Sequence, residues 1–285
     1  MAYKSIVIAP CGNRSTLFKD AWLKQKDIKE FDLCLLFYHE KVDNPELYSI
    51  ADYFYHLKDY KYHMLYYLLD KVHPEWLEEY DFFYFLDDDI EIDTIQINAM
   101  FSLAKAFNAS IVQASLTHDS FCSWPMFKKA RNSFCRFVGQ IEVMAPLFSK
   151  AALKKCLVSF PGNKSSWGVD SVWSKILDYP KDKLIIFDCI TMRHTQPVGG
   201  GELYQKIGVN PHWEWEQITK EYNAKKENYR EYGRLLMVNR NSNIGKYYYY
   251  RFFEFGRAIK RRYKDFGFWD RVKSRLKKVF KSGNT

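Results

Sequence analysis

The stretch YFLDDDIEI, residues 84–92, sets three aspartates directly after an apolar, aromatic run. Neighbouring carboxylates repel one another and are rarely buried without a partner, so packing alone does not explain this cluster. The apolar run predicts a strand over residues 79–86, and the aspartates would then follow its carboxyl end. What their charge serves depends on the segments around them.

Short apolar runs alternate with helix-like stretches on both sides of this segment, which predicts an α/β fold whose sheet carries helices on both faces. Loops that follow strands in such a sheet can meet at one cleft at the carboxyl ends of the strands. The expected strands cover residues 4–10, 31–38, 79–86, 109–116, 137–148 and 183–190, and the expected helices cover about 59–79, 149–157 and a stretch starting within 167–171.

The composition bounds the class of protein. Hydrophobic residues make up 47% of the 285 residues, which excludes a disordered chain. The N-terminus lacks the pattern of a signal peptide, and no apolar stretch reaches the ~18 residues that a membrane-spanning helix needs. The six cysteines are scattered without metal-ligand spacing, which favours a cytoplasmic protein with reduced thiols.

The positive charge is concentrated at one end of the chain. Residues 245–285 hold 13 Lys and Arg against 3 acidic residues, which leaves 30 basic and 31 acidic residues in 1–244. The change in charge predicts a boundary at about residue 245, and we expect an α/β domain over 1–210, a helical segment completing it over 211–244, and a basic helical extension over 245–285. Aromatic and basic residues interleave in this extension, as in helices that lie on an anionic membrane. A nucleic-acid partner, which we disfavour, and a merely solvated helix are the alternatives.

The aspartate cluster has four interpretations. The carboxylates could simply cap the following helix. An EF-hand is excluded because Ile92 and Asn98 stand where the loop needs Gly and Glu. A phosphatase nucleophile is disfavoured because Ile90 and Glu91 follow the cluster rather than Gly-Thr.

The fourth interpretation is a divalent cation, Mn²⁺ or Mg²⁺, shared between carboxylate and diphosphate. Asp87 and Asp89 would lie on one side of an extended chain, with Asp88 pointing elsewhere. The cation would act as a Lewis acid on a departing nucleoside diphosphate. Neither a Walker loop nor a GxGxxG motif occurs, so a P-loop or dinucleotide enzyme lacks its usual phosphate cradle.

Two further segments offer chemistry. In WGVDS (167–171), Asp170 is either a helix-start acid favoured by the helix dipole or a general base for an acceptor hydroxyl. Trp167 and Gly168 beside it are assigned to the acceptor, with the indole as a wall for a sugar ring. In MRHTQPVGGG (192–201), His194 is either structural or the second metal ligand with Asp89. The three glycines that follow are either a plain turn or a loop that closes over a diphosphate.

The blocks QASL (113–116), IEVMAPLFSKAAL (141–153) and SSWGVDSVW (165–173), downstream of FLDDDI (85–90), resemble the DUF707 family of plants and bacteria. That family is related to nucleotide-sugar transferases of the GT-A fold, and the resemblance covers roughly residues 80–200. Two positions depart from its pattern, since Asp88 stands where Glu is usual and Val169 where Leu is common.

The resemblance implies a GT-A-like (Rossmann-like) mixed sheet flanked by helices. It also implies Asp87 toward the nucleotide ribose, Asp89 on the metal and Asp170 as base. The nucleotide-sugar-binding assignments are Pro10, Cys11, Gly12, Lys61, Asp87 and Asp88.

The expected activity is a metal-dependent, inverting glycosyltransferase that uses a UDP-sugar. Its acceptor would be a hydroxyl of a lipid-linked or cell-surface polysaccharide, and the protein would lie on the inner face of the cell membrane. The alternative is a non-catalytic carbohydrate- or nucleic-acid-binding protein that keeps the fold.

Overall fold

The computed structural model describes residues 3–198, 208–227 and 230–237, and Met1–Leu236 form one compact unit. The extension 245–285 and the three glycines at 199–201 lie outside the described residues. The strands are β1 Ser5–Cys11, β2 Asp32–Phe37, β3 Tyr53–His56, β4 Phe82–Phe85, β5 Ile90–Glu91, β6 Ile111–Leu116, β7 Ser133–Val138, β8 Leu147–Ser149, β9 Leu184–His194 and β10 Glu231–Leu236. The α-helices are α1 Pro45–Tyr48, α2 Lys61–Tyr67, α3 Trp76–Glu79, α4 Thr94–Ala106, α5 Lys150–Cys156, α6 Val169–Ile176 and α8 Pro211–Glu221.

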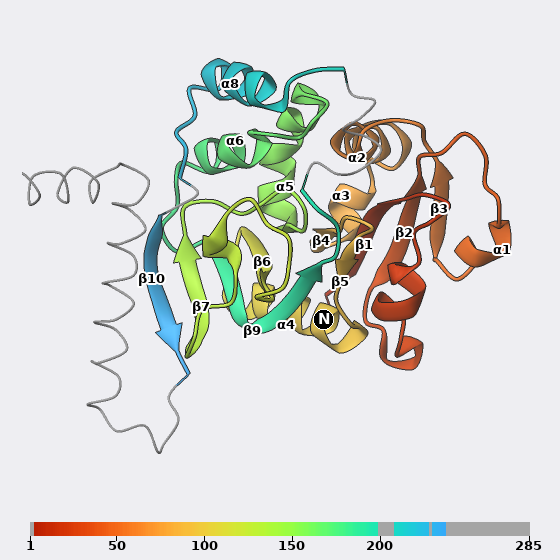
Figure 1. The fold of residues 1–285 in the computed structure, drawn as a ribbon, viewed down its shortest axis with the longest axis horizontal. Helices are drawn as coiled ribbons and strands as arrows, with labels where there is room; N and C mark the ends of the chain where they lie inside the picture. Colours follow the sequence, from red (N-terminus) through yellow and green to blue (C-terminus); the bar gives the residue numbers. More distant parts are fainter. Residues whose placement is uncertain (1–2, 199–207, 228–229, 238–285) are drawn as a thin grey trace, which may run out of the picture. The chain divides into compact units, whose positions relative to one another are not determined.

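The strands form one mixed sheet in the order β10-β7-β9-β6-β8-β4-β1-β2-β3, with β5 paired to β9 (Figure 1). Strands β3, β2, β1 and β4 run parallel, whereas β8 is antiparallel to both of its neighbours, β4 and β6. The central strands β1, β4 and β6 are buried along their whole length, which is why they read as continuous apolar runs. The predicted α/β class is confirmed.

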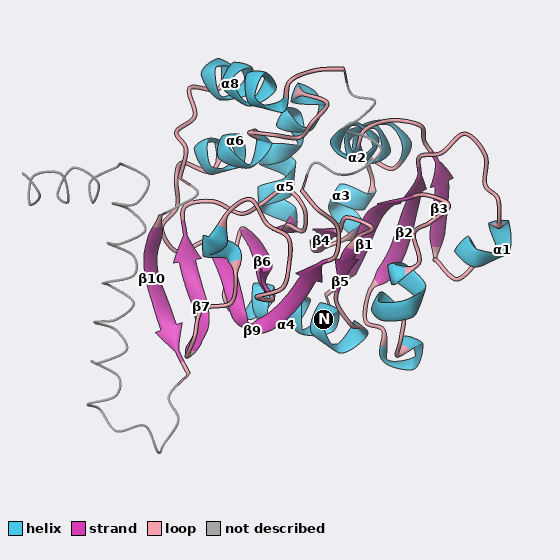
Figure 2. Cartoon of the chain, viewed as in Figure 1, coloured by secondary structure: helices cyan, strands magenta, loops and turns pink. Residues whose placement is uncertain are grey.

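Helices cover both faces of the sheet (Figure 2). In the view of Figure 1, α4 lies below the sheet, and α2, α5 and α6 lie above it. Helix α4 begins with a capping box, in which the Asp93 side chain accepts from the backbone N–H of Gln96 and the Gln96 side chain accepts in return. This helix follows the aspartate segment directly and fixes the exit of the chain from it.

Three expected elements differ from the structure. The stretch 137–148 is not one strand, because β7 ends at Val138 and a buried loop precedes β8. The expected helix 59–79 is interrupted after a π-helical turn, Leu68–Val72, and α3 starts only after Pro74, which cannot donate a helical hydrogen bond. Strand β9 runs on to His194, so Met192 and Arg193 are strand residues rather than loop residues.

The segment 211–244, which we expected to be helical, contains both kinds of structure. Helix α8 begins at Pro211, and the side chain of Asn210 caps it by accepting from the backbone N–H of His212. After it, β10 pairs antiparallel with β7 and extends the sheet. Residues 231–236 therefore add a strand at one end of the sheet.

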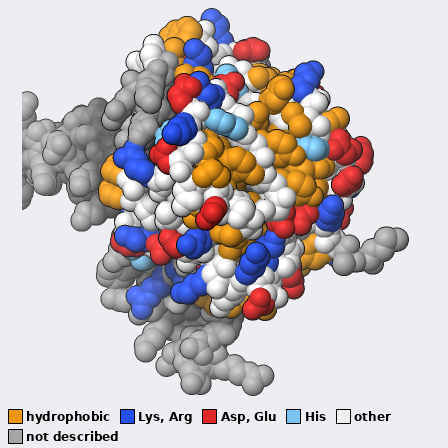
Figure 3. Space-filling model, turned by 90° about the vertical axis from the view of Figure 1, so that its right-hand side faces the viewer, with side chains coloured by type: hydrophobic (Ala, Val, Ile, Leu, Met, Phe, Trp, Pro, Cys, Tyr) orange, Lys and Arg blue, Asp and Glu red, His pale blue; other side chains and the backbone are white. Residues whose placement is uncertain are grey.

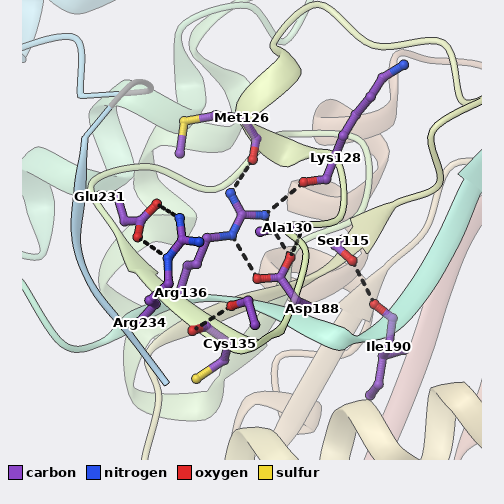
Figure 4. Close-up of polar contacts among 11 residues, drawn as sticks. Ser115, Met126, Lys128, Ala130, Cys135, Arg136, Asp188, Ile190, Glu231 and Arg234 are labelled. Carbon is purple, nitrogen blue, oxygen red and sulfur yellow. Dashed lines mark hydrogen bonds and ion pairs between the residues drawn. The ribbon is translucent and has the colours of Figure 1, made fainter. Parts of the chain in front are cut away.

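A buried ion pair joins β7 and β9 (Figure 4). Arg136 donates from Nε and Nη2 to the two carboxylate oxygens of Asp188, at 2.8 and 2.9 Å. Its other donors reach the carbonyl oxygens of Met126 and Lys128, and Asp188 also accepts from the backbone N–H of Ala130. The pair thus fastens the segment around residues 126–130 to the sheet.

The face at the β3 side gathers hydrophobic side chains in its middle, with charged side chains around them (Figure 3). Strand β3 is the last strand of the sheet at this end, and its Phe54 is 38% exposed. None of the helices in the described ranges is both long enough and apolar enough to cross a bilayer.

Candidate active site

The pairing of β5 with β9 brings together two site residues that lie 105 positions apart. Ile90 pairs with His194 and Glu91 with Arg193. As a result, His194 Nε2 lies 3.1 Å from Asp89 Oδ2, while His194 Nδ1 donates to the carbonyl oxygen of Phe121 at 2.9 Å. Burial lowers the pKa of His194, but the hydrogen bond and charge of Asp89 outweigh this and raise it to about 9.

The three aspartates lie in a turn, closed by a hydrogen bond of 3.1 Å from Ile90 N–H to the Asp87 carbonyl oxygen. The chain therefore turns here, whereas the spacing of the aspartates predicted an extended segment. Asp87 and Asp89 nevertheless share one side, since both line the same cavity. Asp88 turns away and accepts hydrogen bonds from Ser15 and Tyr38, which fixes the turn against the loop after β1.

Lys61 lies in the first turn of α2 and is 9% exposed. Its ammonium contacts Asp87 Oδ1 at 2.7 Å and donates to the carbonyl oxygens of Val143 and Met144 at 2.8 and 3.0 Å. Burial raises the pKa of Asp87, and the charge of Lys61 opposes that rise. An ammonium has three hydrogens to donate, and these three partners account for all of them. Lys61 therefore joins Asp87 to the loop that contains Val143 and Met144.

The other residues assigned to the donor, Pro10, Cys11 and Gly12, are buried at the end of β1 and do not line the cavity. Gly12 donates its N–H to Ser15 Oγ at 2.8 Å, and Ser15 in turn contacts Asp88. These residues therefore reach the aspartate turn through Ser15 and also through Tyr38, whose N–H donates to the Cys11 carbonyl oxygen and whose hydroxyl donates to Asp88.

Asp170 lies in the first turn of α6 and is 8% exposed. Its Oδ1 accepts from the backbone N–H of Ser171 at 2.8 Å. Burial raises the pKa of Asp170 to about 6, although hydrogen bonds from Gln140 and Ser171 oppose that rise. A carboxyl with this pKa is ionised at neutral pH and can accept a proton.

Gly168 is the N-cap of α6, with φ of 87°, a conformation that L side chains rarely adopt. A Cβ at this position would lie 2.7 Å from the Trp215 side chain and 2.9 Å from that of Ile218. Gly168 therefore lets α8 pack closely against the start of α6. This contact brings Trp215 of α8 to the same cavity that Asp170 lines.

A cavity of about 180 Å³ collects the candidate residues. Asp87, Asp89 and His194 form one part of its lining, and Asp170, Gly168 and Trp167 form another. Sequence reasoning placed these six together, but it missed further lining residues. The missed residues that matter below are Trp124, Gln140, Glu142 and Trp215.

Among the four missed residues named above, Glu142 is the one with a titratable side chain, and its pKa is raised. It is 6% exposed, and burial, reinforced by the charge of Asp170, raises its pKa to about 8. The sequence carried a signal for it, because IEVMAP places one acid inside an otherwise apolar run.

Two indoles that line the cavity also hold a lysine. Lys226 Nζ lies 4.3 Å from the ring centroid of Trp124 and 5.1 Å from that of Trp215, within the range of cation–π attraction. Burial lowers the pKa of Lys226, and the charge of Asp170 opposes this. The side of the cavity at Asp170 is thus walled by aromatic rings.

Within the described ranges, no three His, Cys, Asp or Glu side chains are grouped so as to hold a metal ion by themselves. Asp89 and His194 form a pair, and the buried Oδ1 of Asp89 has no hydrogen-bond partner among the described residues. A carboxylate and a neutral imidazole fit a divalent cation whose other ligands come from a bound diphosphate, and such a cation would displace the proton that Asp89 holds on His194.

The chain is similar in structure to two solved proteins. GalNAc-T7 with UDP, GalNAc and Mn²⁺ has a TM-score of 0.56 and 10% identity, over 78% of this chain and 49% of that one. S. aureus TarS, residues 1–349 with UDP-GlcNAc, has a TM-score of 0.49 and 12% identity, over 79% and 68%. The present chain therefore spans about half of the GalNAc-T7 chain, and the likeness to GalNAc-T7 shows a shared GT-A fold.

No curated protein matches the sequence. The sequence profile described as "Protein of unknown function (DUF707)" matches residues 2–236, which is most of the chain and nearly all of its described part. The chain is a member of the DUF707 family, with a GT-A-like α/β fold.

Proposed function

We propose that this protein is a glycosyltransferase that moves a sugar from a nucleotide-sugar donor to a hydroxyl group. The observation that carries the proposal is the common cavity of Asp87, Asp89 and Asp170. The first two follow a central strand of a GT-A-like sheet, where ligands of such sheets bind. Asp170 reaches the same cavity from the first turn of α6. Its pKa of about 6 leaves the carboxylate ionised at neutral pH, as a general base requires.

In the proposed reaction, the Asp170 carboxylate takes the proton of the acceptor hydroxyl as its oxygen attacks the anomeric carbon. The bond between that carbon and the diphosphate oxygen breaks, and the nucleoside diphosphate leaves with the electron pair. Attack from the face opposite the leaving group inverts the anomeric centre. The indole of Trp167, which lines the cavity beside Asp170, would hold the acceptor ring.

On the donor side, Asp87 would accept hydrogen bonds from the nucleotide ribose, while Lys61 holds its carboxylate in place. Asp88 would support the turn through Ser15 and Tyr38. We propose UDP as the nucleotide, since GalNAc-T7, which shares the fold, is described with UDP. Asp89 and His194 would hold Mn²⁺ or Mg²⁺, which when bound neutralises charge on the diphosphate.

Asp89→Ala is expected to remove the Mn²⁺-dependent part of UDP binding, because the carboxylate that would join cation and protein is lost. We expect Mn²⁺ to raise the affinity of the wild type for UDP. With Mn²⁺ present, we expect the variant to bind UDP about 10–100-fold more weakly than the wild type. Titration calorimetry of UDP with and without Mn²⁺ measures this. Glu91→Gln is the matched control, since Glu91 lies two residues further on and forms an exposed ion pair with Arg193. Equal Mn²⁺-dependent affinity in Asp89→Ala would contradict the metal assignment.

We propose a hydroxyl of a lipid-linked or cell-surface polysaccharide as the acceptor, and the inner face of the cell membrane as the place of action. The support is the sequence of residues 245–285, with 13 basic residues against 3 acidic ones. Each cation near an anionic surface contributes about 1 kcal/mol to binding.

Deletion of residues 245–285 is expected to release the protein from liposomes that contain anionic lipid, because the deletion removes the net positive charge of the chain. Flotation on a density gradient measures the bound fraction. Neutral liposomes serve as the control and should bind neither form. Equal flotation of both forms with anionic liposomes would contradict the membrane assignment.

A further inference from the structure

Glu142 presents a buried carboxyl oxygen that nothing in the described part of the chain satisfies. The residue is 6% exposed, it lines the cavity, and its Oε2 has no hydrogen-bond partner there. Buried polar atoms are normally paired, because an unpaired one loses its hydrogen bonds to water without replacement. A cavity-lining atom of this kind indicates a ligand that supplies the missing partner.

The backbone of Glu142 is fixed from the sheet. Its N–H donates to Oε1 of Gln113, a fully buried residue of β6, at 3.0 Å. Two residues earlier, Gln140 Oε1 accepts from Ser171 Oγ and from the backbone N–H of Glu227, both at 3.3 Å. Glu142 is thus held in a defined position beside the start of α6.

The chain that follows Glu142 is bound to the donor side of the site. Val143 and Met144 give their carbonyl oxygens to Lys61, which holds Asp87. The backbone N–H of Asp87 also donates to the Met144 carbonyl oxygen, at 3.0 Å. The charges of Asp170 and Asp87 both act on the Glu142 carboxyl, so Glu142 is close to the residue assigned to the acceptor and to the residue assigned to the nucleotide. The sugar that is transferred must occupy the space between these two.

We propose that the Glu142 carboxyl hydrogen-bonds a hydroxyl or amide of the sugar carried by the nucleotide donor, and thereby selects which nucleotide sugar binds. This inference rests on the proposed glycosyltransferase function. A carboxyl that is protonated at neutral pH offers both a donor and an acceptor, which suits a sugar hydroxyl or an N-acetyl group. The pKa of about 8 that burial gives Glu142 agrees with this state.

The test compares the binding of donors with that of the nucleotide alone. Titration calorimetry on the full chain with Mn²⁺ uses UDP, UDP-glucose, UDP-galactose and UDP-N-acetylglucosamine. We expect Glu142→Ala to weaken the preferred UDP-sugar by about tenfold or more while leaving UDP within about twofold. The preference among the three sugars should shrink in this variant. Glu221→Ala, an exposed position on α8, is the control and should behave as wild type.

The outcomes separate the inference from the function on which it rests. Unchanged sugar preference in Glu142→Ala, or an equal loss for UDP and UDP-sugar, would overturn the role of Glu142 and leave the glycosyltransferase proposal intact. Binding of neither UDP nor any UDP-sugar by wild type would remove both.

Thermal unfolding adds a readout that needs no ligand. Because Oε2 lacks a partner, Glu142→Gln should unfold at a temperature equal to or above that of the wild type. A clearly lower temperature would show that Glu142 supports the fold instead, and would overturn the proposal.

Discussion

Replacing Asp170 by Asn is expected to lower sugar transfer by about 10²–10⁴-fold, the contribution of a general base, with UDP affinity unchanged. Asn has nearly the same shape, and its amide oxygen can still accept from Ser171 N–H, as Asp170 Oδ1 does at 2.8 Å. What it lacks is the basic oxygen that takes the acceptor proton. Release of UDP from a UDP-sugar, with water or an added saccharide as acceptor, measures the loss.

The same variant makes a prediction about pH. Burial raises the pKa of Asp170 to about 6. Below that pH the folded protein carries the protonated carboxyl, which cannot accept a proton, so the wild-type rate should rise as pH passes about 6. The rise should be absent in Asp170→Asn. Its absence would tie the acid limb of the pH profile to this carboxyl rather than to unfolding.

Asp178→Asn is the matched control for this pair of measurements. Asp178 is exposed and lies two residues beyond the end of α6, outside the cavity lining. It should leave both rate and pH profile unchanged. Retention of the wild-type rate by Asp170→Asn would instead assign the base to another group or exclude one.

The sequence indicated the residues of the site better than it indicated their geometry. Asp87, Asp89, Asp170 and His194 stand out because charged or titratable groups follow apolar runs, and the structure brings all four to one cavity. The pairing of β5 with β9 could not be predicted, because β5 has only two residues and its partner is far away in the chain. Long-range pairing of this kind has no local sequence signal.

The missed fold elements have different causes. Helix α4 was omitted although its buried residues Ile97, Met100, Phe101 and Ala104 follow helical spacing and its capping box is readable. The sequence therefore contains a readable signal for this helix. Strand β10 has no such signal, because its residues are half-buried or exposed at a sheet edge, and β7 is its only neighbour in the described part of the chain. Tertiary pairing decided its conformation.

Lys61 illustrates why a residue type alone does not assign a role. From the sequence, Lys61 is assigned to the nucleotide sugar. Its ammonium is instead surrounded by Asp87 and two backbone carbonyl oxygens, with 9% exposure. Such contacts depend on the loop between β7 and β8, whose course the sequence did not reveal.

Asp188→Asn is expected to reduce the free energy of unfolding by about 3–5 kcal/mol, because it leaves the buried guanidinium of Arg136 without a compensating charge. The two side chains are 0% and 4% exposed, and no water can replace the lost carboxylate. The register between β6 and β9 skips from the pair Ala114–Phe187 to Ser115–Thr191, so Asp188 lies in a bulge that frees it for Arg136. For a domain of this size the loss corresponds to a fall in Tm on the order of 10 °C.

Urea unfolding followed by circular dichroism measures the change, with the transition midpoint as the readout. Asp119→Asn is the matched control, because Asp119 also pairs with an arginine, Arg193, but both side chains are about half exposed or more. Its midpoint should stay close to that of the wild type. The double variant Arg136→Met/Asp188→Leu should be more stable than Asp188→Asn, since it leaves no unpaired charge buried. If Asp188→Asn unfolded at the wild-type midpoint, the ion pair could not be what fastens the segment around residues 126–130 to the sheet. The position of the Trp124 indole, which lines the cavity just before this segment, would then need another cause.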